Sequence, residues 1–105
     1  MADSTRDGRA IDVADNPGQS RFEAIVDGEV VGKAVYRVKA GHGDTLVFTH
    51  TEVDPGLRGQ GIGQALAGRA LDLVRASGRQ VVAQCPFIAS YAAQHPQYAD
   101  LVVPS

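Results

Sequence analysis

A strand-like segment, a glycine-rich turn and a helix follow one another directly between residues 45 and 77, and this succession constrains the fold most. The segment TLVFTHTEV, residues 45–53, is rich in β-branched and aromatic residues, which favour a strand. Four glycines then lie between Gly56 and Gly63, and apolar residues recur at helical spacing from Ile62 to Ser77. The segment RQVVAQCPF, residues 79–87, indicates another strand. A strand, a helix and a strand at this spacing form a crossover, so the two strands should be parallel.

The residues before this crossover predict antiparallel strands joined by short turns. AIDVADNPGQSRFEAIVDGEVVGKAVYRV, residues 10–38, indicates three strands with turns at 16–18 and 27–28. Asp-Gly at the second turn suits the type I′ geometry of a tight hairpin. KAGHGD, residues 39–44, indicates a loop, and IASYAAQ, residues 88–94, a short helix. We therefore expect an α/β (α+β) fold, with a mixed, mostly antiparallel sheet of about five strands in the order β-β-β-β-α-β-α.

Side-chain periodicity assigns faces to the central strand and helix. Alternation along residues 45–53 gives one face with Leu46, Phe48, His50 and Glu52, and another with Val47, Thr49, Thr51 and Val53. On the helix, 3–4 spacing predicts a single buried stripe of Ile62, Ala65, Leu66, Ala70, Leu73 and Val74. Gly78 follows where a left-handed C-terminal cap is expected.

Composition narrows the class of protein. The chain has 105 residues, 44% of them hydrophobic, which suits one globular domain; we expect it to span residues 11–103 after a disordered tail over residues 1–10. A formal net charge of −2 disfavours nucleic acid as a partner. No signal peptide or membrane span is expected. Cys85 is the only cysteine, which excludes an internal disulfide and CxxC-type metal sites and fits a cytoplasmic protein; no metal is predicted.

The glycine-rich turn predicts an anion site, because bare backbone N–H groups at a helix N-terminus attract negative charge. A tight turn whose glycines only supply unusual φ angles is the alternative. Two common phosphate loops are excluded by spacing. The nucleotide P-loop requires a Lys that is absent after Gly61, and the dinucleotide fingerprint requires a third glycine at the position of Gln64.

The pattern R-x-x-G-x-G, formed by Arg58, Gly61 and Gly63, resembles the acyl-CoA pyrophosphate motif of the GNAT superfamily of N-acyltransferases. HTEV, the hairpin RFEAIVDGE and CPFIASYAAQHPQYADLV resemble its minimal, single-domain branch, over roughly residues 10–103. The resemblance implies a reduced GNAT fold that binds acetyl-CoA at Arg58, Gly59, Gln60, Gly61, Ile62 and Gly63. The chain lacks the two helices between the first strands and the two final strands of larger members, which form much of their acceptor pocket.

The resemblance also implies a gap between the strands at 45–53 and 79–85, with the pantetheine arm running along Thr51 and Val53. The catalytic candidates beside it are His50, Glu52, Cys85 and Tyr91. His50 suits a general base, although a hydrogen-bonded structural histidine is an equal alternative. Cys85 is a lining residue, a nucleophile whose thiol pKa His50 lowers if their side chains share a face, or a buried hydrophobe. Tyr91 is a proton donor to the CoA thiolate or a packing residue.

Three functional interpretations remain open from the sequence. The first is an acetyl-CoA-dependent N-acetyltransferase that acts on a primary amine by direct transfer in the gap, with acetyl-CoA as co-substrate and an unassigned acceptor. The second is a non-catalytic CoA-binding module, and the third is a structural domain with a glycine-rich turn. A monomer or weak homodimer without a membrane partner is expected.

Overall fold

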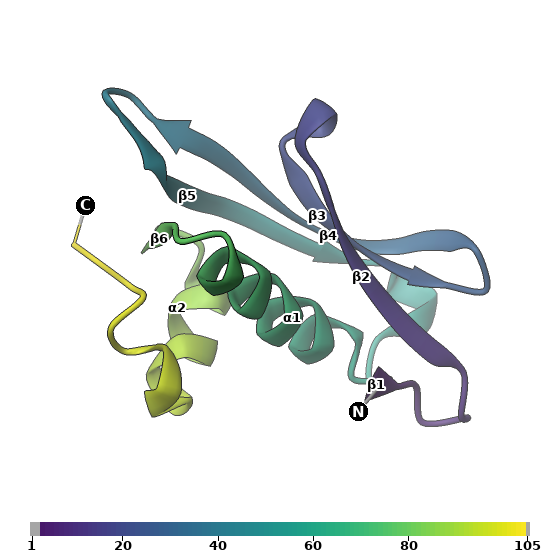
Figure 1. Cartoon of the computed structure of the whole chain (residues 1–105). Helices are drawn as coiled ribbons and strands as arrows, with labels where there is room; N and C mark the ends of the chain where they lie inside the picture. The colour runs from purple at the N-terminus through teal and green to yellow at the C-terminus, as the bar shows by residue number, and fades with distance from the viewer. Residues whose placement is uncertain (1–2, 105) are drawn as a thin grey trace.

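The computed structural model describes residues 3–104 and contains one sheet with two helices (Figure 1). The strands are β1 (Asp3–Ser4), β2 (Ala10–Asn16), β3 (Arg21–Val26), β4 (Glu29–Lys39), β5 (His42–Val53) and β6 (Gln80–Ala83), and the helices are α1 (Ile62–Ala76) and α2 (Pro86–Gln94). The strands are neighbours in chain order, and β5 and β6 form the parallel pair while the other pairs are antiparallel. The mixed sheet and the crossover predicted from the sequence are confirmed.

The local signals at two turns also behave as predicted. Asp27 and Gly28 both have positive φ, 52° and 78°, as a type I′ turn requires. Gly78, with φ of 75°, follows the end of α1 as its left-handed cap. The predicted loop at residues 39–44 is shorter than expected, because β4 continues to Lys39 and β5 begins at His42.

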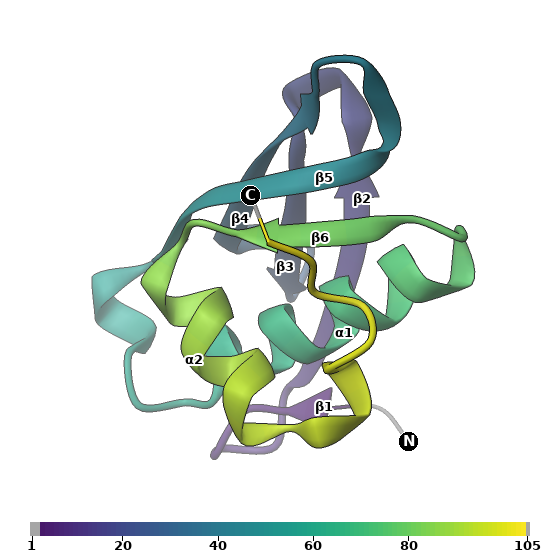
Figure 2. The ribbon, with the colours of Figure 1, turned by 90° about the vertical axis from the view of Figure 1, so that its left-hand side faces the viewer.

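Both helices cover the same side of the sheet, with α1 lying along the curled strands and α2 beside it (Figures 1 and 2). The core between them contains Phe22, Tyr36 and Phe48, whose ring centroids lie 5.4–5.9 Å apart. The predicted stripe of α1 is buried except for Leu73, which is 38% exposed, while Leu71 is fully buried. Leu71 is buried because α1 contacts both the sheet and α2, so the buried arc of the helix is wider than one stripe.

A β-bulge at Thr49 corrects the predicted faces of β5. Val35 of β4 pairs with His50, but Tyr36 pairs with Phe48, so Thr49 is an extra residue in β5. An inserted residue inverts the alternation that follows it. Phe48 therefore points into the core, whereas His50 and Glu52 face the side of the sheet opposite to α1, and Thr51 turns toward the helices.

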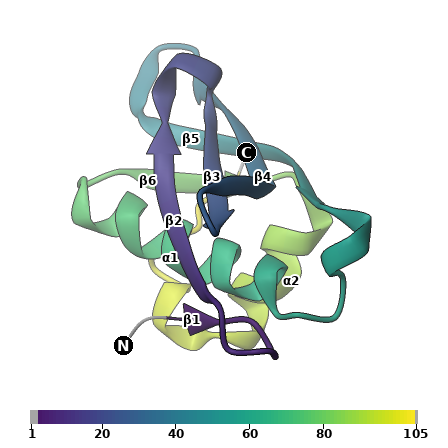
Figure 3. The same cartoon turned by 90° about the vertical axis from the view of Figure 1, so that its right-hand side faces the viewer.

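The chain before β2 also differs from the expected disordered tail. Asp3 and Ser4 pair with Ile11 and Ala10 of β2, and Thr5 is only 4% exposed. Figure 3 shows β1 and the following turn at the base of β2. Residues 1–2 lie outside the described part. Among residues 3–104, neither helix has the length and apolar character needed to cross a membrane.

Candidate functional site

A gap opens between β5 and β6 immediately after the bulge. The two strands pair only from Thr45 to Phe48 of β5, and β6 ends at Ala83 while β5 continues to Val53. The carbonyl oxygen of Phe48 accepts the N–H groups of both Gln84, at 3.1 Å, and Cys85, at 2.9 Å. Beyond this point the chain turns into α2, and Figure 2 shows it leaving β5. One edge of β5 is therefore left without a neighbouring strand.

The peptide groups of Thr51 and Val53 point into this gap. The N–H of Asp54 donates to the carbonyl oxygen of Val31 in β4, at 2.7 Å. Peptide groups alternate sides along a strand, so those of Val53 and Thr51 point away from β4. These two residues were predicted to line the path of a pantetheine arm, and their backbone orientation suits that role.

Cys85 lies at the floor of the gap and immediately before α2. Its side chain is 3% exposed, and its Sγ lies 3.2 Å from Oγ1 of Thr51. Because Thr51 and His50 point to opposite faces of β5, Cys85 and His50 do not share a face. The interpretation in which His50 activates the thiol is therefore not supported by this arrangement.

His50 and Glu52 form a hydrogen-bonded pair on the open face of the sheet. His50 Nε2 lies 2.8 Å from Glu52 Oε1, and Lys33 Nζ lies 3.4 Å from Glu52 Oε2. The hydrogen bond with His50, followed by the interactions with Lys33, lowers the pKa of Glu52 below its usual value. About half of the surface of the His50 side chain, and about half of that of the Glu52 side chain, is exposed. Glu52 is therefore an anion at neutral pH, and it orients the imidazole.

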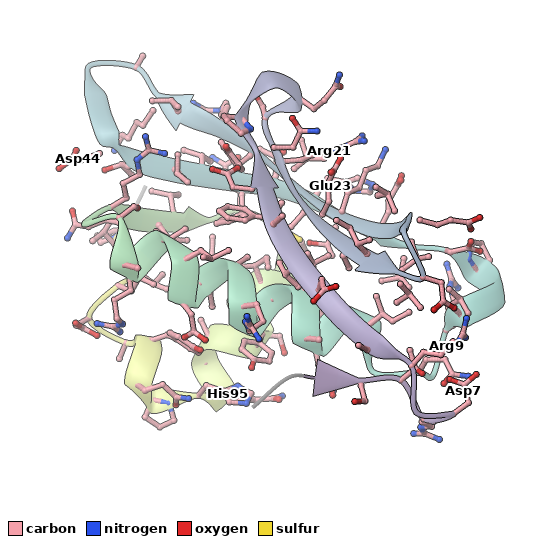
Figure 4. All side chains as sticks on the ribbon, turned by 45° about the vertical axis from the view of Figure 1, so that its right-hand side comes forward. Asp7, Arg9, Arg21, Glu23, Asp44 and His95 are labelled. Carbon is pink, nitrogen blue, oxygen red and sulfur yellow. The ribbon has the colours of Figure 1, made fainter. Side chains whose placement is uncertain are left out.

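This pair lines a groove of about 810 Å³ along the ends of β4 and β5. Arg21, Asp54 and Arg58 also contribute to its wall. Figure 4 shows Arg21 with Glu23 on the sheet, away from α1, and His95 far below near α2. The groove therefore extends from the open face of the sheet to the glycine-rich turn.

The glycine-rich turn presents the first turn of α1 without a side-chain cap. Gly59 and Gly61 both have φ of 81°, and Gly61 is the N-cap residue, with no side chain bonded to the following N–H groups. Before the turn, Asp54 Oδ1 accepts the N–H of Gly56 at 3.0 Å. Helix N–H groups that lack a partner form a site for an anion.

Gly63 has a different role from the other glycines of the turn. It is helical, and a Cβ atom there would lie 3.0 Å from the ring of Phe87 and 3.6 Å from a methyl group of Val53. Unlike Gly59 and Gly61, Gly63 does not have a positive φ. Its small size instead allows Phe87 to pack at the start of α1.

A pocket of about 560 Å³ lies beside this turn, and both of its charged lining residues are arginines, Arg6 and Arg58. Its other lining residues are Ser4, Val53, Leu57, Gly59, Gln60, Gly61, Ile62, Gly63, Gln64 and Phe87. All six residues of the predicted pyrophosphate motif are therefore brought together. Sequence reasoning missed Arg6 and Phe87, because only the pairing of β1 with β2 brings the N-terminus here, and no motif marks either residue.

Comparison with known proteins identifies the family of this chain. The family model described as GCN5-related N-acetyl-transferase matches residues 21–101. The chain belongs to this family. A search of the curated proteins gave no match. Among solved structures, the solution structure of a GCN5-like N-acetyltransferase candidate from Staphylococcus aureus superposes with a TM-score of 0.65. The aligned region covers 90% of this chain and 89% of the Staphylococcus aureus chain. At 19% identity, the likeness shows the fold alone.

Within this GCN5-related fold, Tyr91 lies apart from the gap. Its ring stacks on His95 with centroids 3.9 Å apart, and a Cβ atom on Gly68 would lie 2.6 Å from its hydroxyl oxygen. It lines a third groove between α1 and α2, together with Asp72 and Tyr98. Tyr91 lines neither the groove with Thr51 and His50 nor the pocket with Arg58, although its own groove shares Gly61 and Gln64 with that pocket. Its stacking on His95 suits packing between the helices.

The ionisable residues of this family member do not assemble a metal centre in the described part. Among residues 3–104, no three His, Cys, Asp or Glu side chains lie close enough to hold an ion.

Proposed function

We propose that this chain binds acetyl-CoA in the gap and transfers its acetyl group directly to a primary amine. The proposal rests on two features that adjoin each other. They are the unpaired edge of β5 and the uncapped, arginine-lined turn at the start of α1. The first suits an extended amide-containing arm, and the second suits a pyrophosphate.

The residues of the turn fit the charge and shape of a pyrophosphate. Positive φ at Gly59 and Gly61 turns the backbone so that the first N–H groups of α1 remain available. A Cβ atom on either glycine would meet no other atom within 4 Å, so the space next to the backbone is open. Arg58 adds a positive charge on the same pocket.

The edge of β5 would hold and polarise the thioester. The backbone groups of Thr51 and Val53 pair with the amides of the pantetheine arm, as an added strand would. An N–H group at this edge donates to the thioester carbonyl oxygen, where negative charge develops as the amine attacks.

The acceptor approaches from the open face of the sheet. His50, oriented by the anionic Glu52, accepts a proton from the incoming ammonium group, and the neutral amine then attacks the acetyl carbon. The new amide C–N bond forms and the C–S bond breaks, and the second proton of the amine nitrogen passes to the departing CoA sulfur, so that CoA leaves as the thiol. Burial of Cys85 supports direct transfer over a covalent relay through this residue.

The test is release of the CoA thiol in the presence of a panel of amines, measured together with acetyl-CoA affinity. The proposal predicts amine-dependent thiol release while the mass of the intact protein stays unchanged during turnover. Affinity without turnover for any amine would replace it with a non-catalytic CoA-binding role. If acetyl-CoA leaves the melting temperature unchanged, both CoA-based functions are refuted, since a ligand that binds only the folded state stabilises it.

A further inference from the structure

The N-terminal arm, residues 3–9, is a fixed part of the fold although it precedes the family-matched segment. The N–H of Thr5 donates to the carbonyl oxygen of Arg9 at 2.8 Å, and the N–H of Arg9 donates to Thr5 Oγ1 at 2.9 Å. The N–H of Gly8 closes the turn on the carbonyl oxygen of Thr5 at 3.0 Å. With β1 paired to β2, these bonds give the residues between them a defined position.

That position is beside the glycine-rich turn. The N–H of Arg6 donates to Oε1 of Gln60 at 2.9 Å, which ties the arm to the turn across 54 residues of sequence. Ser4 and Arg6 both line the pocket that Arg58 and the turn form. Figure 1 shows β1 next to the chain that leads into α1.

The two arginines of the arm, Arg6 and Arg9, differ in whether their side chains have partners. Arg9 is paired with Asp7, at 3.1 Å, and with Asp27, at 3.5 Å (Figure 4). Among the residues whose side chains the structure describes, 4–41 and 44–104, the guanidinium group of Arg6 has no hydrogen bond or ion pair, and the pocket that it lines contains no carboxylate. Two arginines and a helix N-terminus thus converge on one pocket that has no carboxylate among these described side chains.

We propose that Arg6 binds a phosphate group of CoA together with Arg58, so that the N-terminal arm completes the donor site. The inference rests on the proposed function, because it assigns a further residue to the same cofactor pocket. CoA carries a pyrophosphate and a 3′-phosphate, and a guanidinium group binds either by charge-assisted hydrogen bonds. The backbone bond to Gln60 fixes where the Arg6 side chain begins, so the entropy lost on binding is reduced.

Calorimetric titration of Arg6→Gln with CoA and with dephospho-CoA tests this inference. We expect CoA to bind about three- to tenfold more weakly than to the unmodified protein, as for a partly exposed charged contact. Affinity should also depend less on salt, since one ion pair is lost. A loss confined to CoA assigns Arg6 to the 3′-phosphate, and a loss shared by dephospho-CoA assigns it to the pyrophosphate; both support the proposal.

Arg37→Gln is the matched control, because Arg37 is an exposed arginine of β4 that lines none of the grooves described above. It should change the affinity by less than about twofold, and Arg6→Lys should recover part of the loss. Equal affinities of Arg6→Gln and Arg37→Gln would overturn the inference. Equal melting temperatures without ligand exclude a folding defect.

Failure of this inference is distinguishable from failure of the proposed function. If the unmodified protein does not bind CoA, the proposed function is wrong and the role of Arg6 with it. If the unmodified protein binds CoA and Arg6→Gln binds it equally well, the donor site stands and the arm has only a structural role.

Discussion

Thr49 decides which way the neighbouring side chains of β5 face. As the extra residue of the bulge, it sends His50 and Glu52 to the open side of the sheet while Thr51 remains toward Cys85. The proposed base and the buried thiol therefore stand on opposite sides of one strand. This separation suits an amine that approaches from the open face and a thioester that lies in the gap.

Substitution of His50 tests the proposed base at the scale of one residue. His50→Ala should lower kcat/KM about 10²-fold or more, because removal of a general base typically has effects of this order. Acetyl-CoA affinity should change little, since the imidazole faces away from the pocket at the turn. Steady-state rates and calorimetric affinities measure the two effects separately.

Glu52→Gln is the companion variant, because it removes the charge next to His50 and keeps the size of the side chain. We expect a smaller loss, about tenfold, since glutamine can still hydrogen-bond the imidazole. A His50→Ala enzyme with the full rate would show that another group accepts the proton.

At the scale of elements, the contact between α1 and α2 depends on one glycine. A Cβ atom on Gly68 would lie 2.6 Å from the hydroxyl oxygen of Tyr91, closer than van der Waals contact allows. The hydroxyl of Tyr98 donates to Asp72 Oδ1 at 2.7 Å, and its oxygen also lies 3.3 Å from the carbonyl oxygen of Gly68. Burial, followed by the bond to Asp72, raises the pKa of Tyr98 above its usual range, so it remains a donor at neutral pH.

The variant Gly68→Ala should therefore destabilise the protein by about 1–3 kcal/mol through overpacking, less the small gain in helix propensity. In a Tyr91→Phe background, the closest contact is gone. The loss in free energy of unfolding caused by Gly68→Ala should then be smaller, by at least about 1 kcal/mol, than in the unmodified protein. A double-mutant cycle in urea measures this coupling. Additive effects within about 0.5 kcal/mol would show that α2 moves to relieve the contact.

The elements themselves follow from local sequence signals. Asp27-Gly28 fixes one hairpin and Gly78 ends α1, because each conformation needs residues that accept positive φ. The helix predicted at 62–77 lies at Ile62–Ala76. The parallel pairing of β5 with β6 follows from the length of the crossover between them.

The site was less predictable than the elements, for physical reasons. The bulge at Thr49 is set by long-range pairing with β4, and strict alternation therefore placed His50 on the face of Phe48. The arm with Arg6 is positioned by pairing of two residues of β1, too short to leave a pattern. The motif of Arg58, Gly61 and Gly63 was visible because the resemblance that it carries depends on a fixed spacing within one turn.

At the scale of the whole molecule, the sheet is covered by helices on one side and carries paired charges on the other. Arg21 Nε lies 2.8 Å from Glu23 Oε2, and Asn16 donates to the same oxygen at 3.2 Å. The hydrogen bond from Arg21, followed by that from Asn16, lowers the pKa of Glu23 below its ordinary 4.5, against the opposing effect of burial. Global stability should therefore depend on this carboxylate being ionised.

The pH dependence of this stabilisation has a defined sign. Because the pKa of Glu23 is lower in the folded state than in the unfolded state, the stabilisation by this carboxylate is complete above about pH 4.5. It is lost as the pH falls through the pKa of the folded state. Glu23→Gln should be less stable by about 1–2 kcal/mol at pH 7, and the difference should shrink toward pH 3. Urea unfolding at pH 7, 5 and 3 measures it. Glu29→Gln, at an exposed carboxylate of β4, is the control, and an equal pH dependence of both variants contradicts the assignment.

The proposed function depends above all on the glycine-rich turn and the free edge of β5 binding acetyl-CoA together. Titration with acetyl-CoA, followed by two-dimensional NMR of backbone amides, tests it most directly in a chain of 105 residues. We expect saturable shifts concentrated at Gly59, Gly61 and Gly63 of the turn and at Thr51 and Val53 of the edge. If binding saturates while these five amide signals do not move, or while the shifts are confined to the hairpin between β4 and β5, acetyl-CoA does not bind at the turn and the edge of β5.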